Sequence, residues 1–255
     1  MQVQLSRDEA WDLLCEWTSS DSLRRHMLAV EAAMRAYAPR FDGDVELWGL
    51  TGLLHDLDYE RYPNLDDLED GHPRSALREL EARGYPPELV RAVASHADFL
   101  GVSRDSPMER ALFAVDELSG FVLAVAYVRP EKLQGMTPKS VKKKLKQPSF
   151  AAAVNREELV HGAEELGVDF DEHLTIVIAA LAERQDELMP ADPSSSSRRA
   201  PSASITTRRC SSKSTPRTAA PSTSSSRPTA AANEGCLSFF LTDFGVIPTS
   251  PSGRT

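Results

Sequence analysis

Apolar residues recur at helical spacing through the first 189 residues, and no stretch shows the alternation of apolar and polar positions that a half-buried strand would require. Helix-start signals mark the same region: Ser6 with Glu9, and Ser106 with Glu109, have the spacing of a capping box. The pattern predicts an all-α fold, a compact multi-helix bundle. The expected helices cover residues 6–17, 21–38, 44–55, 73–83, 87–99 and 106–128, and three more begin near residues 137, 155 and 169, the last ending near residue 188.

The composition changes after residue 189. Residues 191–235 consist mainly of Ser, Thr, Pro, Ala and Arg, and they have almost no large apolar side chain to offset the entropy of ordering. We therefore predict a folded domain over residues 1–189 and a disordered, low-complexity tail over residues 190–255. Out-of-frame GC-rich DNA encodes a similar composition, so a reading-frame artefact is an alternative explanation of the tail.

Charge and apolar content narrow the classes of function. The chain has 29 basic and 38 acidic residues, of which eight and three lie after residue 189, so residues 1–189 carry a formal charge of about −14. Such a surface disfavours nucleic acid and anionic membranes as partners, because both are bound through Lys and Arg. The sequence shows no membrane-length apolar run, no secretory signal, and no cysteine pattern typical of disulfide frameworks or metal sites. We expect a cytoplasmic protein.

Histidines and aspartates occupy apolar helix faces in the first half of the chain. His26 and His96 lie among apolar residues at helical spacing, the pair His55 and Asp56 ends an apolar run, and Asp116 is surrounded by apolar positions. A buried carboxylate needs a partner, and neither helical run offers a nearby Lys or Arg. One inward histidine is usually a hydrogen-bonded core residue, but several on separate helices are typical of a metal site in a helical bundle.

The order of these residues resembles that of the HD-domain superfamily of metal-dependent phosphohydrolases. The resemblance rests on the segments LRRHMLAVEAAMRA, LWGLTGLLHDLDYE, DGHPRSA, ASHAD and FAVDELSGFVLA, and it continues to about residue 188. It implies one divalent metal held by His26, His55, Asp56 and Asp116. His72 and His96 resemble the two extra histidines of the binuclear bacterial subgroup, which implies a second metal held by Asp56, His72 and His96. The alternative for His72 is a loop histidine, because it follows an acidic stretch.

A ligand set of imidazoles and carboxylates suits one or two ions of Mn, Fe, Co, Ni, Zn or Mg. The resemblance implies a phosphohydrolase that cleaves a phosphomonoester or phosphodiester of a nucleotide or small metabolite by attack of a metal-bound hydroxide. Its partner would be a small phosphorylated substrate. Two alternatives remain open: a di-iron oxygenase with the same types of ligand, and a non-catalytic binding module in which the metal ties helices together.

Several further residues are candidates for the site. Asp56 and Asp58 are the expected catalytic carboxylates, and Asp58 has a second possible role, which is to orient a ligand histidine. Ser119 lies one turn after Asp116 and could bind a ligand or phosphate, or simply pack between helices.

A basic segment over residues 129–156 stands out in an acidic domain. It is either a solvated face or a lid that brings cations to a phosphate, in which case Arg129, Lys142 and Arg156 are the expected substrate-binding residues. His161 and His173 follow in polar, Glu-rich helices, where we expect both on the surface.

Overall fold

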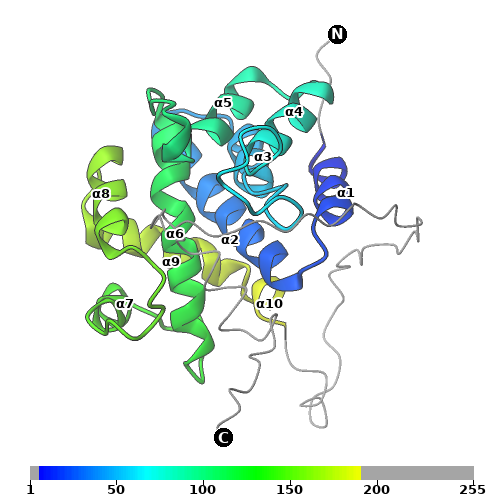
Figure 1. Cartoon of the computed structure of the whole chain (residues 1–255). Coiled ribbons are helices and arrows are strands. Elements are labelled where there is room, and N and C mark those ends of the chain that lie inside the picture. Colours follow the sequence, from blue (N-terminus) through cyan, green and yellow to red (C-terminus); the bar gives the residue numbers. More distant parts are fainter. Residues whose placement is uncertain (1–5, 191–255) are drawn as a thin grey trace, which may run out of the picture.

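The computed structural model describes residues 6–190, and within that range the protein has ten α-helices and no strand (Figure 1). The predicted all-α class is confirmed. The predicted tail lies outside the described residues apart from Pro190. The helices are α1 (Arg7–Trp17), α2 (Asp21–Tyr37), α3 (Val45–Leu54), α4 (Arg74–Ala82), α5 (Pro87–Ser95), α6 (Pro107–Tyr127), α7 (Pro138–Leu145), α8 (Arg156–Leu166), α9 (Phe170–Glu183) and α10 (Gln185–Leu188).

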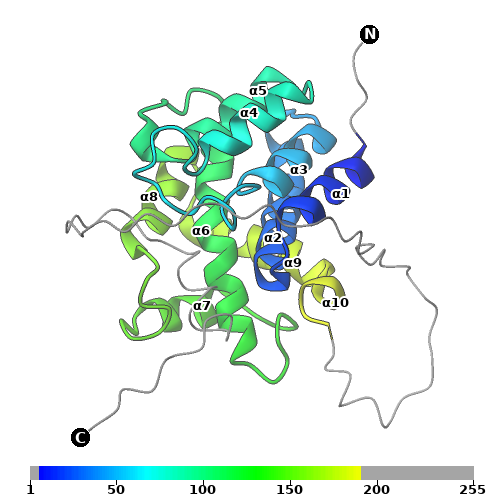
Figure 2. The same ribbon diagram turned by 45° about the vertical axis from the view of Figure 1, so that its right-hand side comes forward.

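Helix α2 lies at the centre of the bundle and packs against α3, α6 and α9. It is buried along nearly its whole length, because apolar residues cover most of its circumference. The longest helix, α6, runs in the opposite direction to α2 (Figure 1). Helices α4 and α5 lie toward the beginning of α6 and α7 lies toward its end (Figure 2). The candidate metal ligands come from the part of the bundle where α2, α3, α5 and α6 meet.

Helices α2 and α3 approach each other at a glycine. A Cβ atom at Gly52 of α3 would lie 2.9 Å from the backbone nitrogen of Glu31 and from the backbone oxygen of Val30 in α2. Any larger residue at this position would push the two helices apart. Because His55 follows Gly52 by one turn, the contact fixes the distance between the histidines of the two helices.

A buried carboxylate joins α2 to the first and last helices of the bundle. The Glu31 side chain is 1% exposed and pairs with Arg7 at the start of α1, with Arg35 on its own helix, and with Arg184 directly before α10. Arg7 binds it with both Nε and Nη2, at 2.7 and 2.8 Å. Burial alone would raise the pKa of Glu31, but the three guanidinium groups outweigh burial and lower it. The charge is therefore retained inside the fold.

Two helices end earlier than their sequence patterns predict. Helix α5 ends at Ser95 and not at residue 99, because the Val93 carbonyl accepts a hydrogen bond from His96 Nδ1 instead of continuing the helical ladder. The last predicted helix is divided at Arg184, whose guanidinium turns to pair with Glu31 and Glu187. In both cases a side-chain bond that sequence spacing does not reveal terminates the helix.

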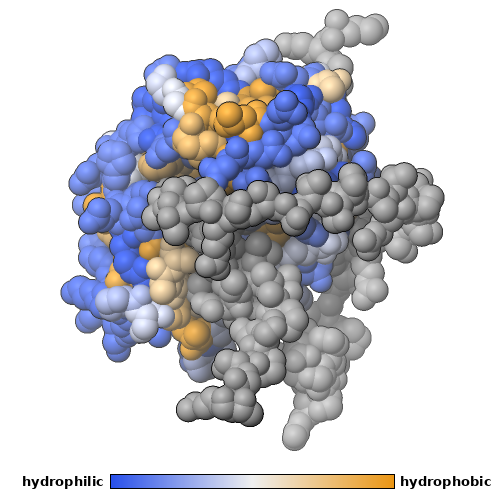
Figure 3. Space-filling model, in the orientation of Figure 1, coloured by the Kyte–Doolittle hydropathy of each residue, from blue (hydrophilic) through white to orange (hydrophobic). Residues whose placement is uncertain are grey.

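The face seen in Figure 3 is mostly hydrophilic, with an apolar patch in its upper part, where Figure 1 places α5. Phe99, in the short 3-10 helix Asp98–Leu100 after α5, is among the exposed large apolar residues. None of the described helices combines the length and apolar character of a membrane span.

Candidate metal centre

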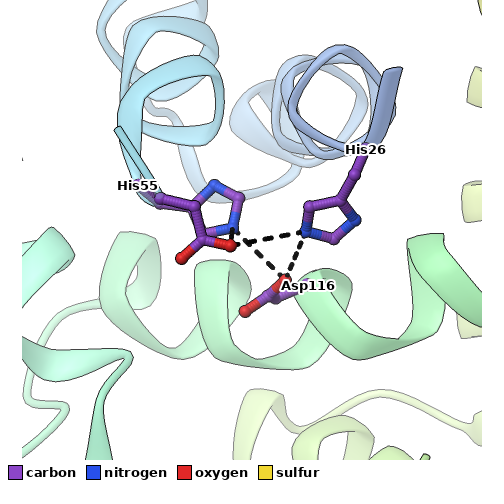
Figure 4. A group of neighbouring side chains, drawn as sticks. His26, His55 and Asp116 are labelled. Carbon is purple, nitrogen blue, oxygen red and sulfur yellow. Dashed lines mark ion pairs between the residues drawn. The ribbon is translucent and has the colours of Figure 1, made fainter. Parts of the chain in front are cut away.

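Four side chains from three parts of the bundle form the first group of the centre. His26 lies on α2, His55 directly follows α3, Asp56 is the next residue, and Asp116 lies on α6 (Figure 4). One potential ligand atom from each of them falls within 4.8 Å of all the others. His26 Nε2 lies 3.0 Å from Asp116 Oδ1, and His55 Nε2 lies 3.3 Å from the same oxygen and 3.2 Å from Asp56 Oδ2.

The second group shares Asp56 with the first. His72 Nε2 and His96 Nε2 each lie 3.4 Å from Asp56 Oδ1. The two carboxylate oxygens of Asp56 therefore face different groups, Oδ2 toward the first and Oδ1 toward the second. The structure brings all six sequence-predicted ligand residues together in these two groups, and His72 is buried among them and does not lie in a solvated loop.

In three of the four clustered histidines, Nδ1 makes a hydrogen bond away from the cluster and Nε2 faces the carboxylates. The Nδ1 atom of His55 bonds the Gly52 carbonyl at 2.9 Å, that of His96 bonds the Val93 carbonyl at 2.5 Å, and that of His72 bonds a carboxylate. Because a carbonyl or carboxylate oxygen can only accept, each Nδ1 carries the proton. Each Nε2 then presents its lone pair to the carboxylates of the cluster, which is the orientation that a metal-binding histidine requires.

Several of the clustered atoms are buried and make no hydrogen bond. Both oxygens of Asp56, Oδ1 of Asp116 and Nε2 of His55 are shielded from solvent and make no hydrogen bond. Lone pairs held 3.0 to 3.4 Å apart repel each other unless a proton or a cation lies between them, and an isolated buried carboxylate is unfavourable by several kcal/mol. The residues present therefore fit a cation, and their nitrogen and oxygen donors suit divalent transition metals.

The pKa values indicate how the cluster balances its charge when no metal is bound. Burial alone would lower the pKa of His55, but Asp56 and Asp116 outweigh burial and raise it well above its ordinary value. Burial likewise acts to raise the pKa of each carboxylate, yet the surrounding imidazoles lower both. A proton on His55 therefore takes the role of a cation, and metal binding at these atoms would release it.

Comparison with protein families agrees with this geometry. Residues 23–120 match the family model of the HD domain. This segment of the chain is an HD domain. The matched segment extends from α2 into α6 and contains all six clustered residues. The prediction of an HD domain is therefore confirmed for residues 23–120, which are less than half of the chain, whereas the phosphohydrolase activity and the binuclear subgroup stay predictions. No curated protein and no solved structure gave a match.

Asp58 does not belong to either group of clustered residues, but it bonds one of them, His72. Its carboxylate is fully buried, with Oδ1 2.7 Å from His72 Nδ1 and Oδ2 2.7 Å from the backbone nitrogen of Ala76, in the first turn of α4. Both oxygens are occupied by donors within the protein. Of the two roles predicted for Asp58, this geometry favours orientation of His72 over proton transfer to a substrate.

The basic segment lies away from the HD cluster and is tied into its own surroundings. Helix α7 lies near the end of α6 that is opposite α5 (Figure 1). Lys142 Nζ lies 2.6 Å from Asp171 Oδ1, Arg129 bonds Ser140 and the Gln134 carbonyl, and Arg156 bonds four backbone carbonyls, including that of Val154 at 2.6 Å. All three cations therefore have partners within the protein, and their role in substrate binding stays a prediction.

Ser119 has the position expected of it, one turn after Asp116, and it is fully buried with no hydrogen bond to its Oγ. It therefore remains a candidate for ligand binding in the HD domain.

The expectation for the two last histidines is half correct. The His161 side chain is 61% exposed, whereas His173 is fully buried, so the prediction of a surface position for His173 is wrong. His173 Nδ1 lies 2.5 Å from the Tyr37 hydroxyl and Nε2 lies 3.0 Å from the Ala114 carbonyl, which joins α9 to α2 and α6. The helical spacing of Leu174, Val177, Ile178 and Leu181 would have placed position 173 on the inward face.

Proposed function

We propose that the protein is a binuclear metal-dependent phosphohydrolase that cleaves a phosphomonoester or phosphodiester of a nucleotide or small metabolite. The observation that carries the proposal is the placement of Asp56, whose two oxygens face two separate groups of imidazole nitrogens. A single structural metal would need only one of these groups, and the shared carboxylate is suited to two ions held close together. Two adjacent metals are a common arrangement in enzymes that hydrolyse phosphate esters.

The proposed ligands of the first ion are His26, His55, Asp56 and Asp116, and those of the second are Asp56, His72 and His96. When bound, the ions would supply an activated water and would neutralise charge on the phosphoryl oxygens. The donor set is compatible with Mn, Fe, Co, Ni, Zn or Mg.

The remaining features of the HD domain determine where a substrate would approach. The side chains of His26, His55 and Asp56 are fully buried, and those of His72 and His96 are 5% and 6% exposed. Asp116 is 18% exposed, the largest exposed fraction among the six side chains. We therefore expect a phosphoryl group to approach beside Asp116, close to Ser119, while Asp58 holds His72 in place.

Phosphate release by the full chain tests the proposal. The protein would be stripped of metal, reloaded with Mn, Co, Ni, Fe or Mg, and assayed against a panel of phosphomonoesters and phosphodiesters. We expect metal-dependent hydrolysis that is lost in Asp56→Asn, an isosteric change that removes the shared charge. Asp66→Asn, which alters an exposed carboxylate in the segment between Asp58 and His72, is the matched control and should retain full activity.

The same assay separates the alternatives. Wild-type protein that binds two metal equivalents yet releases phosphate from no substrate would contradict the proposal, and oxygen consumption by the iron-loaded form would then indicate an oxygenase. Metal binding with neither activity would indicate a binding module.

A further inference from the structure

Arg25 stands out among the arginines of the described residues. Every other arginine between residues 6 and 190 makes at least one hydrogen bond within that range. Arg25 makes neither a hydrogen bond nor an ion pair there, although it is half-buried and its Nε is shielded from solvent. A shielded guanidinium nitrogen without an acceptor is unfavourable, so the position calls for an anion from outside the described residues.

The acidic residues of the neighbourhood do not supply that anion. Asp21, on the same turn of α2, lies 3.6 Å from Arg24, and Glu31 is engaged by three other arginines. In a domain with a large excess of carboxylates, an arginine that pairs with none of them is unusual. The charge of Arg25 is therefore available to a ligand.

The backbone of Arg25 adjoins that of a clustered histidine. It directly precedes His26, so the two Cα atoms are about 3.8 Å apart. Ser119 occupies a related position on the other side, one turn after Asp116 on α6, and its fully buried Oγ also lacks a partner. Helices α2 and α6 pack against each other and run in opposite directions (Figure 1). Hence the residues just before His26 and those just after Asp116 lie toward the same end of the helix pair.

We propose that Arg25 is a substrate-binding residue that holds a phosphoryl group against the metal centre, with the Ser119 hydroxyl as a second donor. The planar guanidinium offers paired N–H groups that match the oxygens of a phosphate, and such charge-assisted hydrogen bonds are about twice as strong as neutral ones. This inference rests on the proposed phosphohydrolase function, and it assigns the anion site to α2, whereas the sequence pattern had pointed to the basic segment.

Binding of inorganic phosphate to the metal-loaded full chain, measured by calorimetry, tests Arg25 apart from catalysis. Arg25→Ala should weaken phosphate binding roughly 10- to 100-fold, as expected for a lost charge-assisted pair, and should leave the metal stoichiometry unchanged. Arg40→Ala is the matched control: it removes the same charge near the other end of α2, from an exposed ion pair with Glu172, and should bind phosphate like the wild type.

Two further variants address folding and cooperation. Arg25→Lys keeps the charge and the aliphatic stem, so a folded protein with a smaller loss of phosphate affinity is expected, because an ammonium group cannot bind two oxygens in parallel. Ser119→Ala should weaken phosphate binding roughly threefold to tenfold. If both contact one phosphate, the losses in the double variant should not simply add.

The outcomes distinguish this inference from the function on which it rests. Equal phosphate affinity in wild type, Arg25→Ala and Arg25→Lys, together with metal-dependent hydrolysis by the wild type, would overturn the role of Arg25 alone. Failure of the metal-loaded wild type both to bind phosphate and to hydrolyse any ester would overturn the proposed function, and the inference with it.

Discussion

Replacement of Asp58 by Asn tests whether the second metal depends on the residue behind His72. The Asp58 carboxylate accepts two hydrogen bonds of 2.7 Å, from His72 Nδ1 and from the Ala76 backbone nitrogen. Asparagine has a single acceptor oxygen, so its amide group must face one of the two donors. His72 would lose either its orientation or the carboxylate that strengthens it as a ligand.

The expected magnitude follows from this geometry. Loss of the group that orients a metal-bound histidine usually weakens metal affinity about 10- to 100-fold, which is about 1.4 to 2.8 kcal/mol. Only the second group contains His72, so the second binding step should weaken while the first, through His26 and Asp116, should remain within twofold of the wild-type affinity. Calorimetric titration of the metal-free full chain with Mn or Co resolves the two steps.

The Asp66→Asn variant, with its exposed carboxylate, is the control and should titrate like the wild type. The reasoning would be refuted if Asp58→Asn bound both equivalents with wild-type affinity. It would also be refuted if both steps weakened equally, because that would indicate a general loss of folding and not the loss of one oriented ligand.

Two predictions concern stability. Glu31→Gln leaves three partly exposed arginines without the buried charge that they share. Urea unfolding should show that the free energy of unfolding decreases by about 2 to 4 kcal/mol. The control Glu81→Gln, on the surface of α4, should change it by less than about 0.5 kcal/mol. Burial lowers the pKa of His173 to about 4, so the unfolded chain binds more protons between about pH 4 and 6.5, and stability should fall as the pH decreases through that window. Relative to His173→Gln, which cannot titrate, the wild type should lose about 3 kcal/mol between pH 7 and pH 4, and parallel pH curves for the two proteins would contradict this assignment.

Much of the helical architecture could be predicted, because the relevant signals are local. The capping boxes at Ser6 and Ser106 start α1 and α6 as expected, with both reciprocal hydrogen bonds in place. The ends of the helices were harder to predict. Helix α5 stops where the His96 ring bonds a carbonyl of its own last turn, and α9 stops where Arg184 turns toward Glu31. These bonds depend on where side chains point after folding.

At the candidate site too, part could be predicted from the sequence and part depended on contacts that form only on folding. Five of the six clustered residues could be identified because inward histidines and aspartates conflict with their apolar surroundings, whereas His72 follows an acidic stretch and was identified through the family resemblance. The basic segment shows a limit of such reasoning, because charge density along the sequence does not reveal which cations already have partners. Lys142 has Asp171, separated from it by 29 positions, whereas Arg25 has no partner in the described residues. Only the folded arrangement distinguishes a satisfied cation from an available one.

Two of the clustered histidines also occupy the carboxyl ends of helices. His55 ends α3 and His96 ends α5, so both helices direct the negative end of their dipole toward the cluster, equivalent to about half an elementary charge each. Together with Asp56 and Asp116, these helix ends produce a field that attracts cations and repels anions. Under the proposed function, a phosphate would be repelled until the cations are in place, so we expect an order of binding in which the metal loads first and the phosphorylated ligand follows.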